Sequence, residues 1–284
     1  MDDYLEEAKA EIARWESEGP GFLAAVGDIV LWAPQKAAEK LIPEAVQDAV
    51  ATAIERFLSG LDSLARSLFD VDEIRRRVGT LRSGNGHELK CADEAAKHYW
   101  NWHVGYAAAE GGAAGAAGLV GLAADVPALF TVALRLIQQI GTCYGYDVST
   151  EAERKYVLHI LRTGSTGDLK AKLECLIGLK QIEEILLNVT WKKMGESYAR
   201  GEISRLAALF GIKKFAKSLG IQVTKRKALQ MVPVVGALVG ASFNATFVND
   251  ISRAAYMSYR RRWIAEREPG NGGDSESTAL IPRN

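Results

Sequence analysis

Apolar residues recur every three or four positions along most of this chain, which is the repeat of an amphipathic α-helix. Residues 2–18 show it first, and the stretch after Pro43 shows it over the greatest length, with Val46, Val50, Ile54, Phe57, Leu61, Leu64 and Leu68 on one stripe. No stretch sustains a strict alternation of apolar and polar residues bounded by hairpin turns. The pattern therefore predicts an all-α fold, a multi-helix globular bundle.

The same repeat predicts the remaining helices, at residues 22–32, 44–69, 70–77, 89–109, 126–143, 151–164, 168–198, 203–219 and 241–268. Residues 83–88 read as a loop and residues 145–149 as a turn, because both are rich in Gly, Ser, Asn and Asp. Thr150 and Glu153 have the spacing of a capping box at the start of the helix that follows.

Residues 105–147 form a long Gly/Ala-rich apolar stretch with only four charges, Glu110, Asp125, Arg135 and Asp147. Each glycine costs a helix interior roughly 0.5–1 kcal/mol relative to alanine. Close helix packing or a bend must offset that cost. A second uncharged run, residues 228–249, has a similar composition. We therefore predict two Gly/Ala-rich central helical hairpins inside the bundle.

The run at residues 228–249 reaches the length of about 20 residues that a helix needs to cross a bilayer. It is a poor membrane anchor because Pro233 interrupts it and because it carries the polar residues Gln230, Ser242, Asn244, Thr246 and Asn249. Burial inside the protein is the favoured interpretation, and insertion into lipid stays open.

Composition predicts one large helical domain, residues 1–268, followed by a disordered tail at residues 269–284 without any apolar period. Lys and Arg number 35 and so do Asp and Glu, so net charge indicates neither nucleic-acid nor membrane binding. The charges are unevenly placed: the N-terminus is acidic, and residues 203–249 contain no acidic residue. We call the cations there the basic window, which includes Lys213, Lys214, Lys217, Lys225, Arg226 and Lys227.

Three isolated cysteines, Cys91, Cys143 and Cys175, fit neither a disulfide framework nor a zinc site. They favour a reducing, cytoplasmic environment, and the acidic start of the chain lacks the features of a secretory signal. We predict no metal ion and no cofactor.

Several short blocks, none diagnostic alone, resemble the EcsC protein family in their order along the chain. They are Ala92-Asp93, Glu110-Gly111, Asp125-Val126-Pro127, Arg135, Tyr144-Gly145-Tyr146-Asp147, the run from Pro233 to Asn244, and Tyr259-Arg260. The resemblance covers roughly residues 6–263. The family is named for a bacterial locus that also encodes an ABC transporter, and many members have no assigned activity. The resemblance therefore implies the fold and a membrane-adjacent context, and it supplies no catalytic residues.

The charged residues of the Gly/Ala-rich stretch are candidates for a polar pocket walled by small residues, together with two polar residues outside it. The full set is Glu110, Asp125, Arg135, Asp147, Asn244 and His103. All of these residues except His103 also have a structural explanation. Glu110 would pair with a basic residue such as Arg135, because burying an unpaired carboxylate is costly. Asp125 would cap the helix at residues 126–143. Asp147 would hold a turn, and Asn244 would bond a neighbouring helix.

Catalytic signatures are missing from the sequence. The stretch Gly164-Ser165-Thr166-Gly167 lacks the strand of a nucleophile elbow, and the glycine run after Glu110 lacks both the strand and the Lys-Ser/Thr pair of a phosphate-binding loop. His103 and Glu110 share a helix face, but no HExxH or Glu-x-x-His spacing supports a metal site. We predict no catalytic residue.

These observations predict a non-enzymatic, cytoplasmic protein that associates peripherally with the inner face of the cell membrane or with a transporter-linked membrane complex. The basic window would contact anionic lipid. One alternative is a small-ligand-binding protein or hydrolase-like enzyme that uses the pocket around Glu110, Asp125 and Arg135. Another is a pore-forming or membrane-inserting protein. Nucleic-acid binding is not expected.

Overall fold

The computed structural model of the chain describes residues 2–19, 52, 69–85, 87–116, 118–166, 169–191 and 233–268. Within these ranges the chain forms helices and no strand. The helices are α1 (Asp2–Ser17), α6 (Val71–Asn85), α7 (Glu88–Ala116), α8 (Gly118–Cys143), α9 (Glu151–Gly164), α10 (Leu169–Trp191) and α13 (Pro233–Arg267). The expected all-α fold is confirmed.

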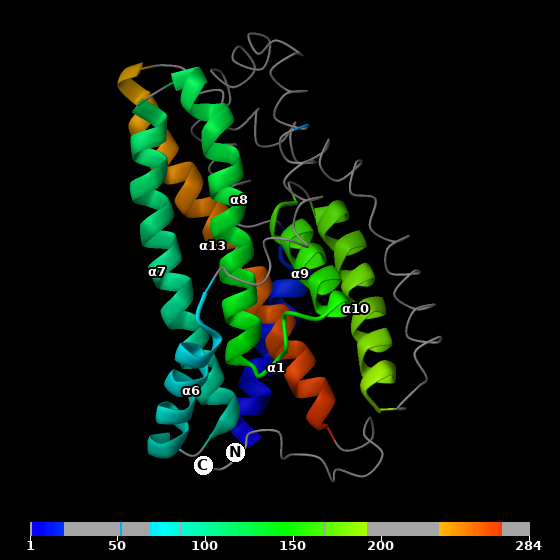
Figure 1. The fold of residues 1–284 in the computed structure, drawn as a ribbon. Helices are drawn as coiled ribbons and strands as arrows, with labels where there is room; N and C mark the ends of the chain where they lie inside the picture. The colour runs from blue at the N-terminus through cyan, green and yellow to red at the C-terminus, as the bar shows by residue number, and fades with distance from the viewer. Residues whose placement is uncertain are drawn as a thin grey trace.

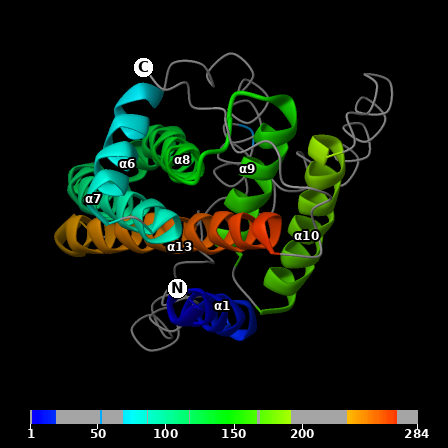
Figure 2. The same ribbon diagram turned by 90° about the horizontal axis from the view of Figure 1, so that it is seen from below.

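The bundle is organised around α13, a helix of 35 residues near the C-terminus. It packs against α7, α8, α9, α1 and α10. Figure 2 shows α13 crossing the middle of the molecule, with α6, α7 and α8 on one side, α1 on the other, and α9 and α10 towards its C-terminal half. This one long helix near the C-terminus thus joins segments from the beginning and the middle of the chain.

The Gly/Ala-rich stretch forms a long antiparallel hairpin of α7 and α8 (Figure 1). Helix α7 ends at Ala116 and α8 begins at Gly118. Helix α7 continues through Gly111-Gly112, since alanines, the best helix formers, surround this pair. Helix α8 starts at Gly118, eight positions before the predicted start at Val126. The first predicted hairpin is therefore present.

The second Gly/Ala-rich region does not form a hairpin within the described residues. From Pro233 onward it is the N-terminal half of α13, which runs unbroken to Arg267. Proline is well tolerated in the first turn of a helix, where its missing N–H has no intrahelical partner to lose. Residues 228–232 lie outside the described part of the chain. No helix of the described residues has the length and apolar character that crossing a membrane requires.

Two local predictions are confirmed between α8 and α10. Gly145 has φ of +90°, a conformation that side-chain-bearing residues rarely adopt, in the turn that leaves α8. The Thr150 side chain caps α9 by accepting a hydrogen bond from the backbone N–H of Glu153 at 3.2 Å. The Glu153 side chain, however, binds Arg262 of α13 instead of completing the capping box.

One loop is shorter than predicted. Helix α6 extends to Asn85 and α7 begins at Glu88, so helices replace most of the loop expected at residues 83–88. The helices predicted at residues 22–32 and 203–219, nearly all of the one at 44–69, the basic window and the tail at residues 269–284 lie outside the described residues.

Candidate functional site

The six residues of the predicted polar pocket lie on four parts of the fold. His103 and Glu110 are on α7, Asp125 and Arg135 on α8, Asp147 in the turn after α8, and Asn244 on α13. Asp125 lies 18 positions before Cys143, the last residue of α8. At 1.5 Å per residue this is about 27 Å along the helix axis. Asp147 is therefore at the opposite end of α8 from Asp125, and the six residues do not line one pocket.

The expected capping role of Asp125 is wrong, because Asp125 lies inside α8 rather than at its start. The predicted turn role of Asp147 is confirmed. Its exposed carboxylate accepts hydrogen bonds from the backbone N–H of Ser149 at 3.1 Å and from the Ser149 hydroxyl at 2.6 Å. Asp147 thus organises the α8–α9 turn.

His103 is buried between α7 and α8, where its Nε2 lies 2.6 Å from the side-chain oxygen of Gln139. Burial lowers the pKa of His103 to about 4, the Gln139 hydrogen bond opposes this shift, and the charge of Arg135 adds to it. A neutral histidine hydrogen-bonded to an amide joins the two arms of the hairpin. Sequence reasoning did not identify Gln139 as the partner.

Asn244 is fully buried on α13, and Glu110 and Arg135 are partly buried. The pairing of Glu110 with Arg135 and the hydrogen bond from Asn244 to a neighbouring helix stay predictions. Within the described residues, no three or more His, Cys, Asp or Glu side chains group closely enough to hold a metal ion.

The most concentrated polar structure of the described bundle is a run of three arginines on α13, Arg260, Arg261 and Arg262, which we call the arginine cluster. Successive residues of a helix point in directions about 100° apart. Each arginine therefore meets a different set of helices. Arg260 binds Asp93 of α7 and Glu11 of α1, Arg261 binds Glu183 of α10 and Glu16 of α1, and Arg262 binds Glu153 of α9 and Glu266 of α13 itself.

Tyrosines surround the arginine cluster and donate hydrogen bonds to its carboxylate partners. The hydroxyls of Tyr4 and Tyr144 donate to the two oxygens of Asp93, at 2.7 and 2.6 Å. The Tyr156 hydroxyl donates to Glu183 at 2.5 Å. The guanidinium of Arg262 lies 4.0 Å from the centre of the Tyr146 ring, within cation–π distance. Buried charges need such partners, so we assign the arginine cluster a structural role in joining helices.

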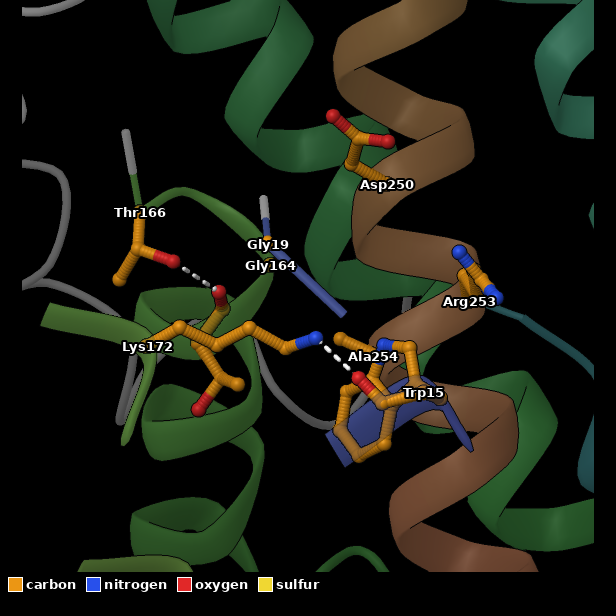
Figure 3. Close-up of a pocket in the computed structure, with 9 residues that line it drawn as sticks. Trp15, Gly19, Gly164, Thr166, Lys172, Asp250, Arg253 and Ala254 are labelled. Carbon is orange, nitrogen blue, oxygen red and sulfur yellow. Dashed lines mark hydrogen bonds between the residues drawn. The ribbon is translucent and has the colours of Figure 1, made fainter. Parts of the chain in front are cut away.

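A small cleft opens where the C-terminal ends of α1 and α9 meet α10 and α13 (Figure 3). Its lining includes Trp15, Gly164, Lys172 and Arg253. The ammonium of Lys172 donates hydrogen bonds to the backbone carbonyls of Trp15 and Glu18, the latter at 2.9 Å. Lys172 thereby caps the C-terminal end of α1, where a cation is favoured by the helix dipole.

Burial lowers the pKa of Lys172 to about 8, and the charge of Arg253 acts in the same direction. Sequence reasoning missed this lysine. One signal was available, because Lys172 precedes Leu176 and Leu179 by four and seven positions and so lies on the buried stripe of α10.

A different surface is formed by two aromatic side chains on α7. Trp102 and Tyr106 are 53% and 47% exposed, and their rings stack with centroids 5.5 Å apart and planes 8° apart. The other exposed positions of this face between residues 101 and 109 are Asn101, Gly105 and Ala109. This face of α7 is therefore aromatic and uncharged while open to solvent.

The fold and its buried ion pairs define an all-α bundle assembled around one long C-terminal helix. A model of the EcsC protein family matches residues 6–264, and the chain belongs to this family. It is similar to an uncharacterized protein, YdbA, of Bacillus subtilis (strain 168), with 26% identity over 245 residues that cover 82% of this chain and 84% of that protein. No solved structure matches the chain significantly.

Two of the sequence blocks that resemble the EcsC family meet at the arginine cluster. The blocks Ala92-Asp93 and Tyr259-Arg260, which open and close the resemblance, lie together in the fold because Asp93 and Arg260 form an ion pair.

Proposed function

We propose that this protein is a non-enzymatic helical protein that associates peripherally with the cytoplasmic face of a membrane, or with a membrane complex there. The observation that carries the proposal is the exposed, stacked pair of Trp102 and Tyr106 on α7. Tryptophan and tyrosine are enriched at membrane–water interfaces, since each combines an apolar ring with a polar group.

The surroundings of the pair support the same function. From Asn101 to Ala109 the exposed positions of α7 carry no charge, so this face meets a lipid headgroup region without burying an ion. The pair also lies on α7, the first helix of the Gly/Ala-rich hairpin. The basic window would supply attraction to anionic lipid, at about 1 kcal/mol for each lysine or arginine near the surface.

The test is flotation of the purified protein with anionic and neutral liposomes at low and high salt. We expect binding to anionic liposomes that weakens as salt rises. The double variant Trp102→Gln/Tyr106→Gln should bind several-fold more weakly, because it removes both interfacial rings. Its matched control is Leu173→Gln/Ile177→Gln on α10, since these two apolar side chains are also exposed, at 46% and 59%. The control should bind as the unmodified protein does.

A second variant tests the electrostatic part. Replacing Lys213, Lys214 and Lys217 with glutamate should abolish the salt-sensitive binding. Salt-resistant binding with release of an enclosed dye would instead support the membrane-inserting alternative. Absence of binding to any liposome, or equal loss of binding in the α7 and α10 variants, would contradict the proposal.

A further inference from the structure

Helix α1 makes a series of charged contacts with the bundle. Glu11 binds Arg260 at 2.5 Å, Glu16 binds Arg261 and Lys180, and Glu18, just beyond the helix, binds Arg253 at 2.6 Å. The carbonyls of Trp15 and Glu18 accept hydrogen bonds from Lys172. Three carboxylates of the N-terminal segment thus meet a surface of five cations, which we call the α1 seat: Lys172, Lys180, Arg253, Arg260 and Arg261.

The apolar contribution of α1 is narrow. Its buried apolar positions are Ala8, Ile12 and Trp15, with Tyr4 and Leu5 partly buried beside them. Ala8, Ile12 and Trp15 are spaced by four and three positions and form one stripe. The bound helix is therefore defined by a simple pattern, a thin apolar stripe flanked by carboxylates at positions 11, 16 and 18.

The α1 seat belongs to α10 and α13, and other contacts hold it in place. Arg260 is also bound by Asp93 at 2.8 Å, and Arg261 by Glu183 at 2.7 Å. Without α1, these two arginines would keep one carboxylate each and lose the other. Lys172, Lys180 and Arg253 would lose their contacts with α1 altogether. Arg260 is buried, and Arg253 and Arg261 are partly buried. Such cations are unfavourable when they lose anionic partners, so the α1 seat selects an acidic occupant.

We propose that the α1 seat is a receptor groove for an acidic amphipathic helix of a partner protein, and that α1 occupies it in cis as an internal competitor. The partner helix carries carboxylates and a short apolar stripe in the α1 pattern, and it binds when α1 is displaced. This interaction is separate from the proposed membrane contact, because Trp102 and Tyr106 lie on α7, whereas the cations of the α1 seat lie on α10 and α13.

The experiment uses a fluorescent peptide of residues 2–19 as the stand-in for the partner helix and the full chain as the receptor. The receptor variant Glu16→Lys/Glu18→Lys weakens the internal competitor, because it places cations against Arg261, Lys180 and Arg253. Its matched control, Asp3→Lys/Glu7→Lys, makes the same change of charge at exposed positions of α1.

We expect the peptide to bind the Glu16→Lys/Glu18→Lys receptor at least about tenfold more tightly than the unmodified chain, since a tethered competitor acts at high effective concentration. The control receptor should behave as the unmodified chain. A peptide that itself carries Glu16→Lys and Glu18→Lys should not bind, and raised salt should weaken binding of the unmodified peptide.

Failure of the peptide to bind a Glu16→Lys/Glu18→Lys receptor of unchanged helix content would overturn the proposal. So would equal binding of the charge-reversed peptide. Dimerisation of the receptor variant with unmodified chains would also overturn it, because the occupant would then be α1 of a second copy. If the variant does not fold, hydrogen exchange on the unmodified chain tests the proposal instead. The amides of α1 should exchange before those of α13, and they should exchange faster at high salt. Simultaneous exchange of both helices would refute a displaceable α1.

Discussion

Asp93 and Arg260 form an ion pair at 2.8 Å in which both side chains are buried, and this pair ties α7 to α13. Two tyrosine hydroxyls donate hydrogen bonds to Asp93, and the Glu11 carboxylate binds Arg260. These contacts replace hydrogen bonds that water would otherwise make to the two charges. Breaking a buried pair by removing one partner is costly, because the other charge is left in a poorly solvated place.

The first prediction therefore concerns this pair. Asp93→Asn and Arg260→Gln should each reduce the free energy of unfolding by about 3 kcal/mol, and the double variant should lose clearly less than the sum of the two. Urea unfolding of the four proteins gives this comparison. Additive losses would show that the two charges do not depend on each other.

The second prediction concerns the contact of Gly141 with Tyr259. A Cβ atom at Gly141 would lie 2.6 Å from Cζ of the fully buried Tyr259 ring, which has little room to move. Gly141→Ala should therefore lower the free energy of unfolding by roughly 1–3 kcal/mol. Gly105→Ala is the matched control on α7, since a Cβ there meets no atom within 4 Å. It should stabilise the protein slightly in the same urea series, and a stabilising Gly141→Ala would disprove the tight packing.

The third prediction separates backbone strain from crowding at Gly145. This residue has φ of +90°, and a Cβ atom added to it would meet open space, so only its conformation opposes a side chain. Gly145→Ala should cost roughly 1–2 kcal/mol, and Gly145→Asn should cost less because asparagine tolerates positive φ better. Thermal unfolding of both variants measures the difference. Equal stability of the three proteins would mean that the turn rearranges.

The fourth prediction concerns acid stability. The pKa of the buried His103 is lowered to about 4 from the usual 6.5, mainly by burial. Between these two pKa values His103 is protonated in the unfolded chain but neutral in the folded chain. The contribution of His103 to the free energy of unfolding is therefore fully present above pH 6.5 and is lost as pH falls towards 4. At 1.36 kcal/mol per pKa unit, His103 contributes at most about 3 kcal/mol to this loss.

His103→Asn should flatten the fall of melting temperature between pH 6.5 and pH 4, because asparagine keeps a polar group beside Gln139 and does not titrate. The exposed His98 is the control, and His98→Asn should change the slope much less. Part of the fall should remain in His103→Asn, since burial also lowers the pKa of His159 to about 4. An unchanged slope in His103→Asn would contradict the assignment.

The sequence by itself determined the features that depend on near neighbours. The three- and four-residue repeat predicted the class of fold and the extent of α1 and α9. It does so because the face of each helix that packs into the core must be apolar. Thr150 and Gly145 were also recognisable, since a cap and a left-handed turn are local to a few residues.

Helix ends in the Gly/Ala-rich regions were beyond local reasoning. The starts of α8 and α13 each lie eight residues before the predicted positions. Helix propensity differs by only about 1 kcal/mol between glycine and alanine, so packing against neighbouring helices decides where such a helix begins. This is also why Asp125 is an interior residue of α8 and not its cap.

The tertiary structure alone decided the partners of the buried charges. Nothing near Arg260 in the sequence indicates that it binds Asp93 of α7 and Glu11 of α1, and nothing near Lys172 indicates that it caps α1. A buried charge is stabilised by whichever opposite charge or carbonyl the fold brings within a few ångströms, and that distance depends on how α1, α7, α10 and α13 cross. The period of the sequence determined the helices, and their crossing determined what the charged residues do.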